Sequence, residues 1–530
     1  MKQIGFKNFR RFEQFPSLDL APITIFVGEN NAGKSTVVKG ILALSDFLKR
    51  WREDDDVDFY ISERRLKSNT HKLVKYLRNQ KFYFNTSYLA HIGTFKRALY
   101  NKAEVGIITF SASLGLVDLS IDVIGDRKDE ESVSGIISKV KVIYNTIGVT
   151  LLFDLQNDVA NVLFAPPLPE HVEKPLIPHI KDAVLDFYKQ YKKPVEFSVK
   201  ISDYYFGYGP DLISSLESSV ENAINVTLYN NSTDYIVGVE ESFPNRPKLN
   251  ISEDIIKFLQ LFCESISSAR PGSSRIRRRP FSLPLIPIRT LLKIEYLYAH
   301  AVTQTVIYSA KDTNDYLSRT IHEYASTPKT TNDHRRTFIV RWMKEFGIGK
   351  DFLITSVGGE AHIVKIQDEN DEWVNLSDKG MGSIQLMVLL FRLAITLPKQ
   401  TISDEVIKRR AMNSRSSRII IIEEPEQNLH PMLQSKLADF LFILNQEYGY
   451  CFIIETHSEY LIRKSQVIVK ENFNDVNRPL KENPFKVYYF NSSSSEEPYY
   501  EIVYQNDGNF SNDFGRGFFD EASNLAFKIL

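Results

Sequence analysis

Cysteine is scarce in this sequence, and neither sign of charge is in excess. The 530 residues include two cysteines, Cys263 and Cys451, which stand far apart in unrelated surroundings. Such isolated thiols form neither a disulfide framework nor the clustered ligand set of a zinc site. The formal net charge is −1, so the chain as a whole has no basic character, and any surface for nucleic acid has to be local.

Long hydrophobic runs are also missing. No stretch comes near the ~18 consecutive apolar residues that span a bilayer, and the opening MKQIGFKNFRRF alternates like a strand, unlike a signal peptide. No heptad pattern persists over about three repeats, which argues against a long coiled-coil arm. We therefore expect a cytoplasmic protein that has no membrane partner and roughly two to four domains.

The sequence does contain a glycine-rich loop with a strand pattern before it and a helix pattern after it. Residues 28–36, GENNAGKST, match G-x-x-x-x-G-K-[ST]. A β-branched, apolar run precedes the loop at 23–27, and apolar residues at three- and four-residue spacing follow it over 37–48. In this arrangement backbone N–H groups and a helix N-terminus bind phosphate. The match predicts ATP contacts at Gly28, Asn30, Asn31, Ala32, Gly33, Lys34, Ser35 and Thr36.

The side chains at the end of this loop have distinct expected roles. Lys34 would reach the β- and γ-phosphates, the Ser35 hydroxyl would bind Mg²⁺, and Thr36 would lie near the α-phosphate. A plain glycine-rich turn would not need this flanking pattern. We therefore expect ATP and Mg²⁺ as the ligands of the chain.

Two adjacent carboxylates follow the most apolar run of the chain. Residues 419–422 are four isoleucines, as in the buried central strand of a parallel sheet, and Glu423 and Glu424 come next. Ligands bind beyond the carboxyl ends of such strands. One carboxylate could hold Mg²⁺ through its water shell, while the next accepts a proton from the water that attacks the γ-phosphate. The alternative is that both acids begin a helix, because Pro425 follows them.

Three further segments accompany these motifs. EQNLHP at 426–431 leads into a helix with leucines on one face, and an apolar strand at 451–454 ends in ETHS. Upstream, LSDKGMGSIQ at 376–385 has the pattern of a glycine-bearing start to an apolar helix. Gly380, Gly382 and Ser383 are expected to present free N–H groups there, which would make a second anion site.

The order of these motifs resembles the ABC-type ATPase heads of the SMC, RecF and overcoming-lysogenization-defect superfamily. The resemblance covers about residues 1–110 and 290–465. It implies an α/β fold, namely a two-lobed P-loop head of mixed sheet flanked by helices, with an inserted α+β domain. It also implies that Glu423 holds the metal with Ser35 and that Glu424 is the catalytic base.

The same resemblance assigns further roles around the nucleotide. It implies that His457 is the catalytic switch histidine, which senses the γ-phosphate, and that Lys34 acts with it. Arg10 and Arg11 fall where relatives contact nucleotide, and Gln80 is the candidate for the Q-loop glutamine.

The 376–385 segment resembles the signature motif, which in this superfamily caps the γ-phosphate of ATP on the partner subunit. Ser377, Gly380, Gly382 and Ser383 would then act in trans. A chain with one phosphate loop and one signature needs a second copy, in a two-fold arrangement that encloses two ATPs. We expect a homodimer or a higher even oligomer.

We divide the chain into four parts on these patterns. They are an N-terminal lobe of the head (1–111), an inserted α+β domain (112–288), a C-terminal lobe (289–465) and a C-terminal segment that packs on the head (466–530). Within the inserted domain we expect short strands at 140–144, 149–153 and 224–228, and helices at 179–191, 212–223 and 255–267. In the third part, the aromatic residues of a helix at 334–346 are expected to be core residues.

Two local basic stretches, at 273–280 and 408–418, leave two possibilities open. They are solvated charge runs or contacts to the phosphate backbone of DNA or RNA. A charged stretch at 51–67 has the composition of a solvated insertion.

The C-terminal segment bears on the function of the whole chain. About seventy residues follow His457, and they contain no D-x-D pair of the kind a Toprim nuclease uses. We therefore expect the chain not to be a nuclease itself. Residues 507–522 resemble the terminal segment of stand-alone ATPases from prokaryotic defence islands, such as the PtuA type of Septu and Septu-like retron systems or, as second choice, the AriA type of PARIS. The same residues could equally be an aromatic segment that packs on the head, and both readings can hold.

The resemblance implies an ATPase that controls a separately encoded effector nuclease, of HNH or Toprim type, in anti-phage defence. Two alternatives stay open. One is a DNA-binding repair ATPase like RecF, and the other is a sensor or scaffold that holds ATP with little turnover. A transporter subunit fits less well, because of the large central insertion.

Overall fold

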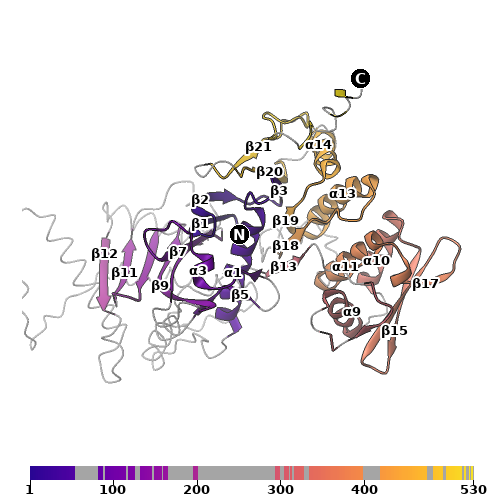
Figure 1. Ribbon diagram of the computed structural model, residues 1–530, viewed down its shortest axis with the longest axis horizontal. Helices are drawn as coiled ribbons and strands as arrows, with labels where there is room; N and C mark the ends of the chain where they lie inside the picture. The colour runs from indigo at the N-terminus through magenta and orange to yellow at the C-terminus, as the bar shows by residue number, and fades with distance from the viewer. Residues whose placement is uncertain are drawn as a thin grey trace, which may run out of the picture. The chain divides into compact units, whose positions relative to one another are not determined.

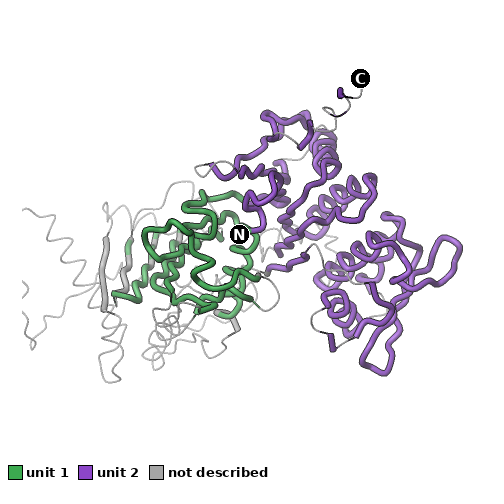
Figure 2. The backbone as a smooth tube through the Cα atoms, viewed as in Figure 1, with its two compact units in different colours: residues 1–19, 36–293 green, residues 20–35, 294–530 purple. Residues whose placement is uncertain are grey.

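The computed structural model describes two compact units of the chain (Figure 2). One consists of residues 1–19 and 36–293, and the other of residues 20–35 and 294–530. The described residues are 1–53, 81–86, 90–114, 117–125, 132–145, 148–157, 159–164, 195–200, 293–298, 304–309, 311–312, 315–327, 333–397, 418–473, 482–492, 497–515, 518–520, 525 and 527–528.

Several predicted features lie outside the described residues. They are most of the charged stretch at 51–67, Gln80, Cys263, the strand at 224–228, the helices at 179–191, 212–223 and 255–267, the basic loop at 273–280, and the basic stretch at 408–418 except for Arg418.

The first unit is built on one long antiparallel sheet (Figure 1). Its strands are in the order β12, β11, β10, β9, β8, β7, β1 and β2, and β4 pairs with β9. Their bounds are β1 (Gln3–Phe9), β2 (Phe12–Asp19), β4 (Lys81–Tyr83), β7 (Ile107–Ser113), β8 (Val117–Gly125), β9 (Ser134–Tyr144), β10 (Val149–Asp154), β11 (Val159–Phe164) and β12 (Val195–Lys200). The strands predicted at 140–144 and 149–153 are confirmed as the end of β9 and as β10. Strand β7 runs through residues 111 and 112, so the sheet continues across the expected domain boundary.

Helix α1 (Lys34–Glu53) packs against β1 of this sheet, and a glycine allows the close approach. Ring carbons of Phe6 lie 2.5 Å from the position that a Cβ on Gly40 would occupy. A short helix, α3 (Phe95–Ala98), and a small hairpin of β5 (Asn85–Thr86) and β6 (Ala90–His91) complete this unit among the described residues.

The second unit contains a sheet whose central strands are parallel (Figure 1). The strand order is β13 (Lys293–Leu297), β18 (Arg418–Glu423), β19 (Cys451–Glu455), β3 (Ile23–Gly28), β20 (Phe485–Phe490) and β21 (Tyr499–Ile502). The strands predicted at 23–27, 419–422 and 451–454 are confirmed, and their apolar residues are buried, as expected for strands covered on both faces. Because the strands are parallel, their carboxyl ends meet at one edge of the sheet.

Helices and a small second sheet complete this unit. They are α9 (Tyr316–Ser326), α10 (His334–Glu345), α11 (Met381–Thr396), α13 (Pro431–Tyr448) and α14 (Glu459–Phe473), with β14 (Tyr308–Ser309), β15 (Asp351–Val357), β16 (Ala361–Gln367) and β17 (Trp373–Asn375). Among the helices that the structure describes, none has the length and apolar character to cross a membrane.

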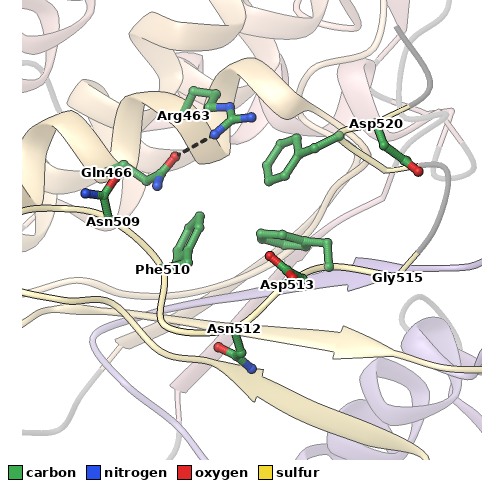
Figure 3. A pocket seen from close by; sticks show the side chains of 10 residues that line it. Arg463, Gln466, Asn509, Phe510, Asn512, Asp513, Gly515 and Asp520 are labelled. Carbon is green, nitrogen blue, oxygen red and sulfur yellow. Dashed lines mark hydrogen bonds between the residues drawn. The ribbon is translucent and has the colours of Figure 1, made fainter. Parts of the chain in front are cut away.

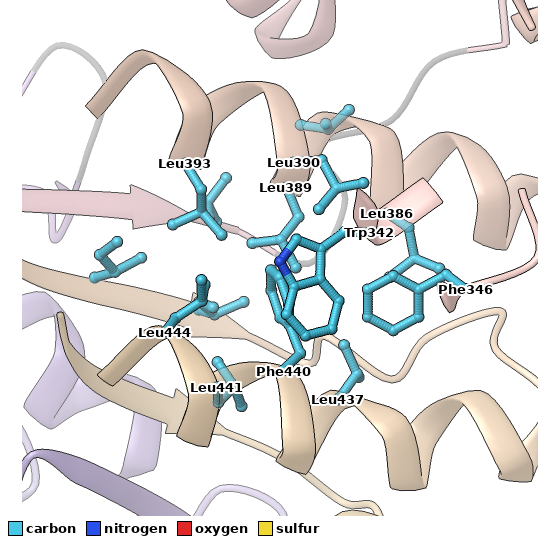
Figure 4. Packing of buried hydrophobic residues seen from close by; sticks show 14 of the residues in the cluster. Trp342, Phe346, Leu386, Leu389, Leu390, Leu393, Leu437, Phe440, Leu441 and Leu444 are labelled. Carbon is cyan, nitrogen blue, oxygen red and sulfur yellow. The ribbon is translucent and has the colours of Figure 1, made fainter. Parts of the chain in front are cut away.

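One apolar core joins the helices of the second unit (Figure 4). Trp342 of α10 lies edge-on to Phe440 of α13, with ring centroids 4.5 Å apart, and leucines of α11 and α13 surround the pair. The predicted core role of the 334–346 aromatic residues is confirmed, because Trp342 is 4% exposed. Gly347 follows the helix in the left-handed conformation, at φ 66°.

The aromatic residues near the C-terminus pack against this core. Phe510, Phe514, Phe518 and Phe519 are partly buried on it, and the guanidinium of Arg463 on α14 lies 4.1 Å from the Phe519 ring centroid. Arg463 and three of these aromatic residues, Phe510, Phe514 and Phe519, line a pocket of about 550 Å³ together with Asp513 and Asp520 (Figure 3). None of the predicted ATP contacts lines this pocket.

Truncating Trp342 to alanine should destabilise the second unit by about 3–5 kcal/mol, because it removes a buried indole from a core that cannot fully collapse around the void. The measurement is urea unfolding followed by circular dichroism. Trp373→Ala is the matched control, because Trp373 on β17 is 43% exposed and the same truncation there should change the unfolding free energy little. Equal losses in the two variants would contradict this account of the core.

Candidate active site

The glycine loop connects the carboxyl end of β3 to the start of α1, as the sequence predicts. Gly28 and Gly33 have φ values of 124° and 109°, and Asn31 has a φ of 60°. Only glycine fits at residue 28, because a Cβ would lie 2.2 Å from the carbonyl oxygen of Phe490 on β20. Asn30 and Asn31 are exposed and Ala32 is buried. The loop therefore turns tightly into the helix whose first residues are Lys34, Ser35 and Thr36.

Lys34 is folded back onto the loop. Its Nζ donates to the carbonyl oxygens of Gly28, at 3.0 Å, and Glu29, at 2.9 Å, and the side chain is 4% exposed. Burial lowers the pKa of Lys34, while the carboxylates of Glu455 and Glu424 act in the opposite direction. An amine held by carbonyl oxygens can exchange them for phosphate oxygens, which are stronger acceptors.

Ser35 makes the most direct link between the loop and the carboxylates. Its Oγ donates to Glu455 at the end of β19, with distances of 2.9 Å to Oε1 and 3.1 Å to Oε2. Ser35 is exposed, whereas Glu455 is 6% exposed. Burial, with the charge of Glu423 as the second cause, raises the pKa of Glu455 to about 7.

Glu423 stands at the end of β18, beside Glu455. The parallel register pairs Glu423 with Glu455 and Glu455 with Phe26 of β3. Tyr296 of β13 hydrogen-bonds to the Glu423 carboxylate, and burial together with that carboxylate raises the pKa of the Tyr296 phenol. The sheet thus brings the predicted metal carboxylate to the same edge as the phosphate loop.

Glu424 follows in an unusual backbone conformation. Its φ is 45°, in the left-handed region, and its N–H donates to the carbonyl of Glu455 at 2.7 Å. The side-chain amide of Gln427 donates to the Glu424 carboxylate, and Gln385 of α11 donates to the Glu424 carbonyl at 3.3 Å. The alternative that the two acids begin a helix is wrong, since Glu423 ends β18 and α13 begins only at Pro431.

His457 lies two residues beyond the end of β19 and near Lys34 and Glu424. Its backbone N–H donates to Glu426 Oε1 at 2.6 Å, and the N–H of Thr456 donates to Phe26 of the neighbouring strand at 3.1 Å. Partial burial and the positive charge of Lys34 lower the pKa of His457. Its imidazole is therefore neutral at pH 7 and able to accept or donate one hydrogen bond.

The signature-like segment forms a helix start, with one difference from the prediction. Ser377 lies in a 3₁₀ turn at 376–378, and Gly380 is the N-cap of α11. The expectation of a free N–H is wrong for Ser383, because this group donates to the Gly380 carbonyl at 2.9 Å. The helix tightens into a 3₁₀-type turn at its first residues. A Cβ on Gly382 would lie 2.4 Å from the Asn428 carbonyl oxygen, so this helix start packs against the loop after β18.

Arg10 and Arg11 lie in the turn between β1 and β2, in the first unit. Arg10 has a φ of 53°, and its N–H donates to the Ala98 carbonyl at 2.7 Å. Burial and, second, the nearby Arg97 lower the pKa of Arg10. The contact of both arginines with nucleotide stays a prediction.

Sequence reasoning missed three residues of this site, namely Glu455, Tyr296 and Gln427. Glu455 and Gln427 carried a signal, since one ends an apolar strand and the other stands three residues after Glu424. Tyr296 carried none, because only the sheet order places β13 beside β18.

The residues present suit a magnesium ion that is bound together with a nucleotide. In the described part of the chain no group of three or more His, Cys, Asp or Glu side chains could hold a metal alone. Mg²⁺ is commonly held by one or two carboxylates plus substrate phosphates and waters. Ser35 with Glu423 and Glu455 fits that pattern, because a hydroxyl and two carboxylates lie at the edge where the phosphates would bind.

The loop, its lysine and the facing carboxylates define a P-loop nucleotide-binding ATPase site of α/β type. The model of the AAA ATPase domain family matches residues 1–462. The chain belongs to that family.

Two solved structures illustrate the wider likeness. The SMC head domain from Thermotoga maritima aligns with a TM-score of 0.30 and 9% identity, over 95% of this chain and 98% of that chain. A Pyrococcus furiosus Smc head domain with an extended coiled coil, bound to the C-terminal domain of ScpA, aligns with a TM-score of 0.34 and 9% identity, over 100% and 98%. At such low identity and TM-score these likenesses have no bearing on function. A comparison with curated proteins found no match.

Glu455 makes the stability of the metal-free protein depend on pH. Its folded-state pKa of about 7 lies above the ordinary 4.5, so its contribution is fully present below pH 4.5 and is lost as the pH rises to 7. Glu455→Gln should remove this loss. The difference in unfolding free energy between Glu455→Gln and the wild type should therefore be more favourable to the variant at pH 8, in EDTA, than at acidic pH, by on the order of 2–3 kcal/mol. Urea unfolding at several pH values measures it.

Glu360→Gln is the control for that series, because Glu360 is exposed and only paired with Lys311 at the surface. It should leave the pH dependence unchanged. An unaltered pH dependence in Glu455→Gln would contradict the burial of a strained carboxylate at this position.

Proposed function

We propose that the chain binds and hydrolyses ATP as an ABC-type ATPase. The proposal rests on one observation. The phosphate loop, the Ser35–Glu455 hydrogen bond and Glu424 lie at the same edge of the parallel sheet. Backbone N–H groups of the phosphate loop and the start of α1 bind the phosphates, and Lys34 leaves its two carbonyl partners to join them.

Ser35 and Glu423 would hold a magnesium ion, which would supply neutralisation of the phosphate charge when bound. Glu424 is the general base for the attacking water. Gln427 and Gln385 fix the orientation of Glu424, because they bind its carboxylate and its carbonyl. His457, neutral at pH 7, contacts the γ-phosphate.

The proposed working form is a dimer. Gly380 caps a helix whose first two N–H groups, those of Met381 and Gly382, precede the first hydrogen bond of the helix, and this start makes an anion site for the phosphate of a facing subunit. Gln385 on the same helix touches the Glu424 carbonyl of its own chain. Binding of the partner's ATP at the signature-like segment is in this way coupled to Glu424, the general base of the same chain.

The biological role that we propose is control of a separately encoded effector nuclease in prokaryotic anti-phage defence. The support is the motif order together with the aromatic segment near the C-terminus, which resembles stand-alone defence ATPases. In the structure this segment and α14 line a pocket of polar and aromatic side chains, which includes the exposed Asp513 and Asp520. The effector is expected to be of HNH or Toprim type.

Lys34→Ala should lower steady-state phosphate release by at least about a hundredfold, because it removes the cation that binds the β- and γ-phosphates. Glu424→Gln should also lower release by roughly a hundredfold or more, since it removes the general base, yet it should retain ATP and accumulate a nucleotide-bound dimer. Phosphate release and light scattering after size-exclusion chromatography measure both.

Lys39→Ala, one turn further along α1, is the control and should hydrolyse ATP like the wild type. Undiminished hydrolysis in both Lys34→Ala and Glu424→Gln would refute the ATPase assignment.

Co-expression of the chain with the neighbouring genes of its native locus tests the effector. We expect a nuclease to co-purify in a fixed ratio, as determined by mass analysis of the intact complex. Duplex DNA binding by the chain alone, with a steep salt dependence and no co-purifying nuclease, would instead support a DNA-repair ATPase.

A further inference from the structure

Glu455 is the carboxylate that the predicted magnesium ligand actually contacts. Both of its oxygens lie within hydrogen-bond distance of Ser35 Oγ, at 2.9 and 3.1 Å. Glu423, the carboxylate that motif order assigns to the metal, is instead bonded by the phenol of Tyr296. The strand order explains this arrangement, because β19 lies between β18 and the loop strand β3.

A serine hydroxyl that binds a cation through an oxygen lone pair must give its hydrogen to another acceptor. A carboxylate is the strongest acceptor for that hydrogen among neutral and charged side chains. Glu455 already occupies this position, and it is buried while Ser35 faces solvent. The hydroxyl oxygen is therefore left open on the side from which a metal–nucleotide complex can approach.

The position of Glu455 also has an electrostatic consequence. It is in register with Glu423, so two carboxylates lie side by side at the edge where the phosphates bind. Without a divalent cation these carboxylates repel the phosphates of ATP, and with the cation they attract the metal that the phosphates carry. The single positive charge of Lys34 cannot neutralise both carboxylates and the nucleotide.

We propose that Glu455 is a positioning residue of the magnesium site, which orients the Ser35 hydroxyl toward the metal and makes ATP binding depend on Mg²⁺. This inference rests on the proposed ATPase function. It assigns a role at the magnesium site to the Glu455 carboxylate, whereas the motif order assigns such a role to Glu423 alone.

The test is the affinity for a fluorescent ATP analogue, measured in excess Mg²⁺ and in excess EDTA. The wild type should bind much more tightly with Mg²⁺. In Glu455→Gln the ratio of the dissociation constant in EDTA to that in Mg²⁺ should fall by about tenfold to a hundredfold, because a charge-assisted hydrogen bond is lost. Part of the fall should come from tighter binding in EDTA, which a merely structural defect would not produce.

A double-mutant cycle shows whether Glu455 acts through Ser35. We expect the Ser35→Ala and Glu455→Gln double variant to bind the analogue in excess Mg²⁺ nearly as Ser35→Ala alone does, and Ser35→Thr, which keeps the hydroxyl, to keep the wild-type ratio. Glu455→Asp serves if Glu455→Gln does not fold, because shortening the side chain withdraws the carboxylate from Ser35 and should produce the same loss.

Two outcomes overturn the inference while leaving the ATPase proposal intact. One is an unchanged ratio in Glu455→Gln with a reduced ratio in Glu423→Gln. The other is an additive loss of the affinity in excess Mg²⁺ in the double variant. A wild type that binds no ATP under either condition would overturn the ATPase proposal itself and this inference with it.

Discussion

The parallel register of β18, β19 and β3 is the constraint on which the site depends. It sets Glu423 beside Glu455 and Glu455 beside Phe26, two residues before the loop begins at Gly28. Two buried or half-buried carboxylates, a lysine and a serine are thus held within one edge of a sheet whose interior is isoleucine, valine and phenylalanine. The stability of that apolar interior supports the electrostatic strain at its edge, which is visible in the raised pKa of Glu455 and the lowered pKa of Lys34.

The strained groups are satisfied from within the site. Lys34 bonds to carbonyls of its own loop, the Ser35 hydroxyl bonds to Glu455, and Gln427 bonds to Glu424. The carbonyl partners of Lys34 compete with the phosphates for the same amine, whereas Glu455 and Gln427 keep Ser35 and Glu424 in position. A nucleotide would therefore replace the existing hydrogen bonds of Lys34, and the difference between the old and new partners of this amine, not the number of contacts, would contribute to the affinity.

Motifs with strict spacing and strongly apolar runs could be predicted from the sequence. The phosphate loop, the isoleucine strand and the strand that ends in Glu455 lie where their local patterns place them, because each pattern is set by residues close in the chain. The relation between them could not be predicted in the same way. Which carboxylate faces Ser35 depends on strand order, and the contact of Tyr296 with Glu423 depends on a strand more than a hundred residues upstream. The Ser383 N–H was mispredicted because the helix start closes a 3₁₀ turn, a choice of one backbone hydrogen bond that spacing does not determine.

The central claim is that each ATP site is completed by a second copy of the chain, and a mixing experiment tests it most directly. Gly380→Glu should fold normally, since nothing lies within 4 Å of a Cβ at that position, but it should block the signature and abolish hydrolysis. Lys34→Ala should be inactive because its own phosphate loop lacks the lysine. Mixed in equal amounts and allowed to exchange, the two inactive proteins should recover about a quarter of the wild-type rate, because half of the dimers then hold one intact composite site. No recovery in the mixture, or full activity of Gly380→Glu alone, would contradict the account.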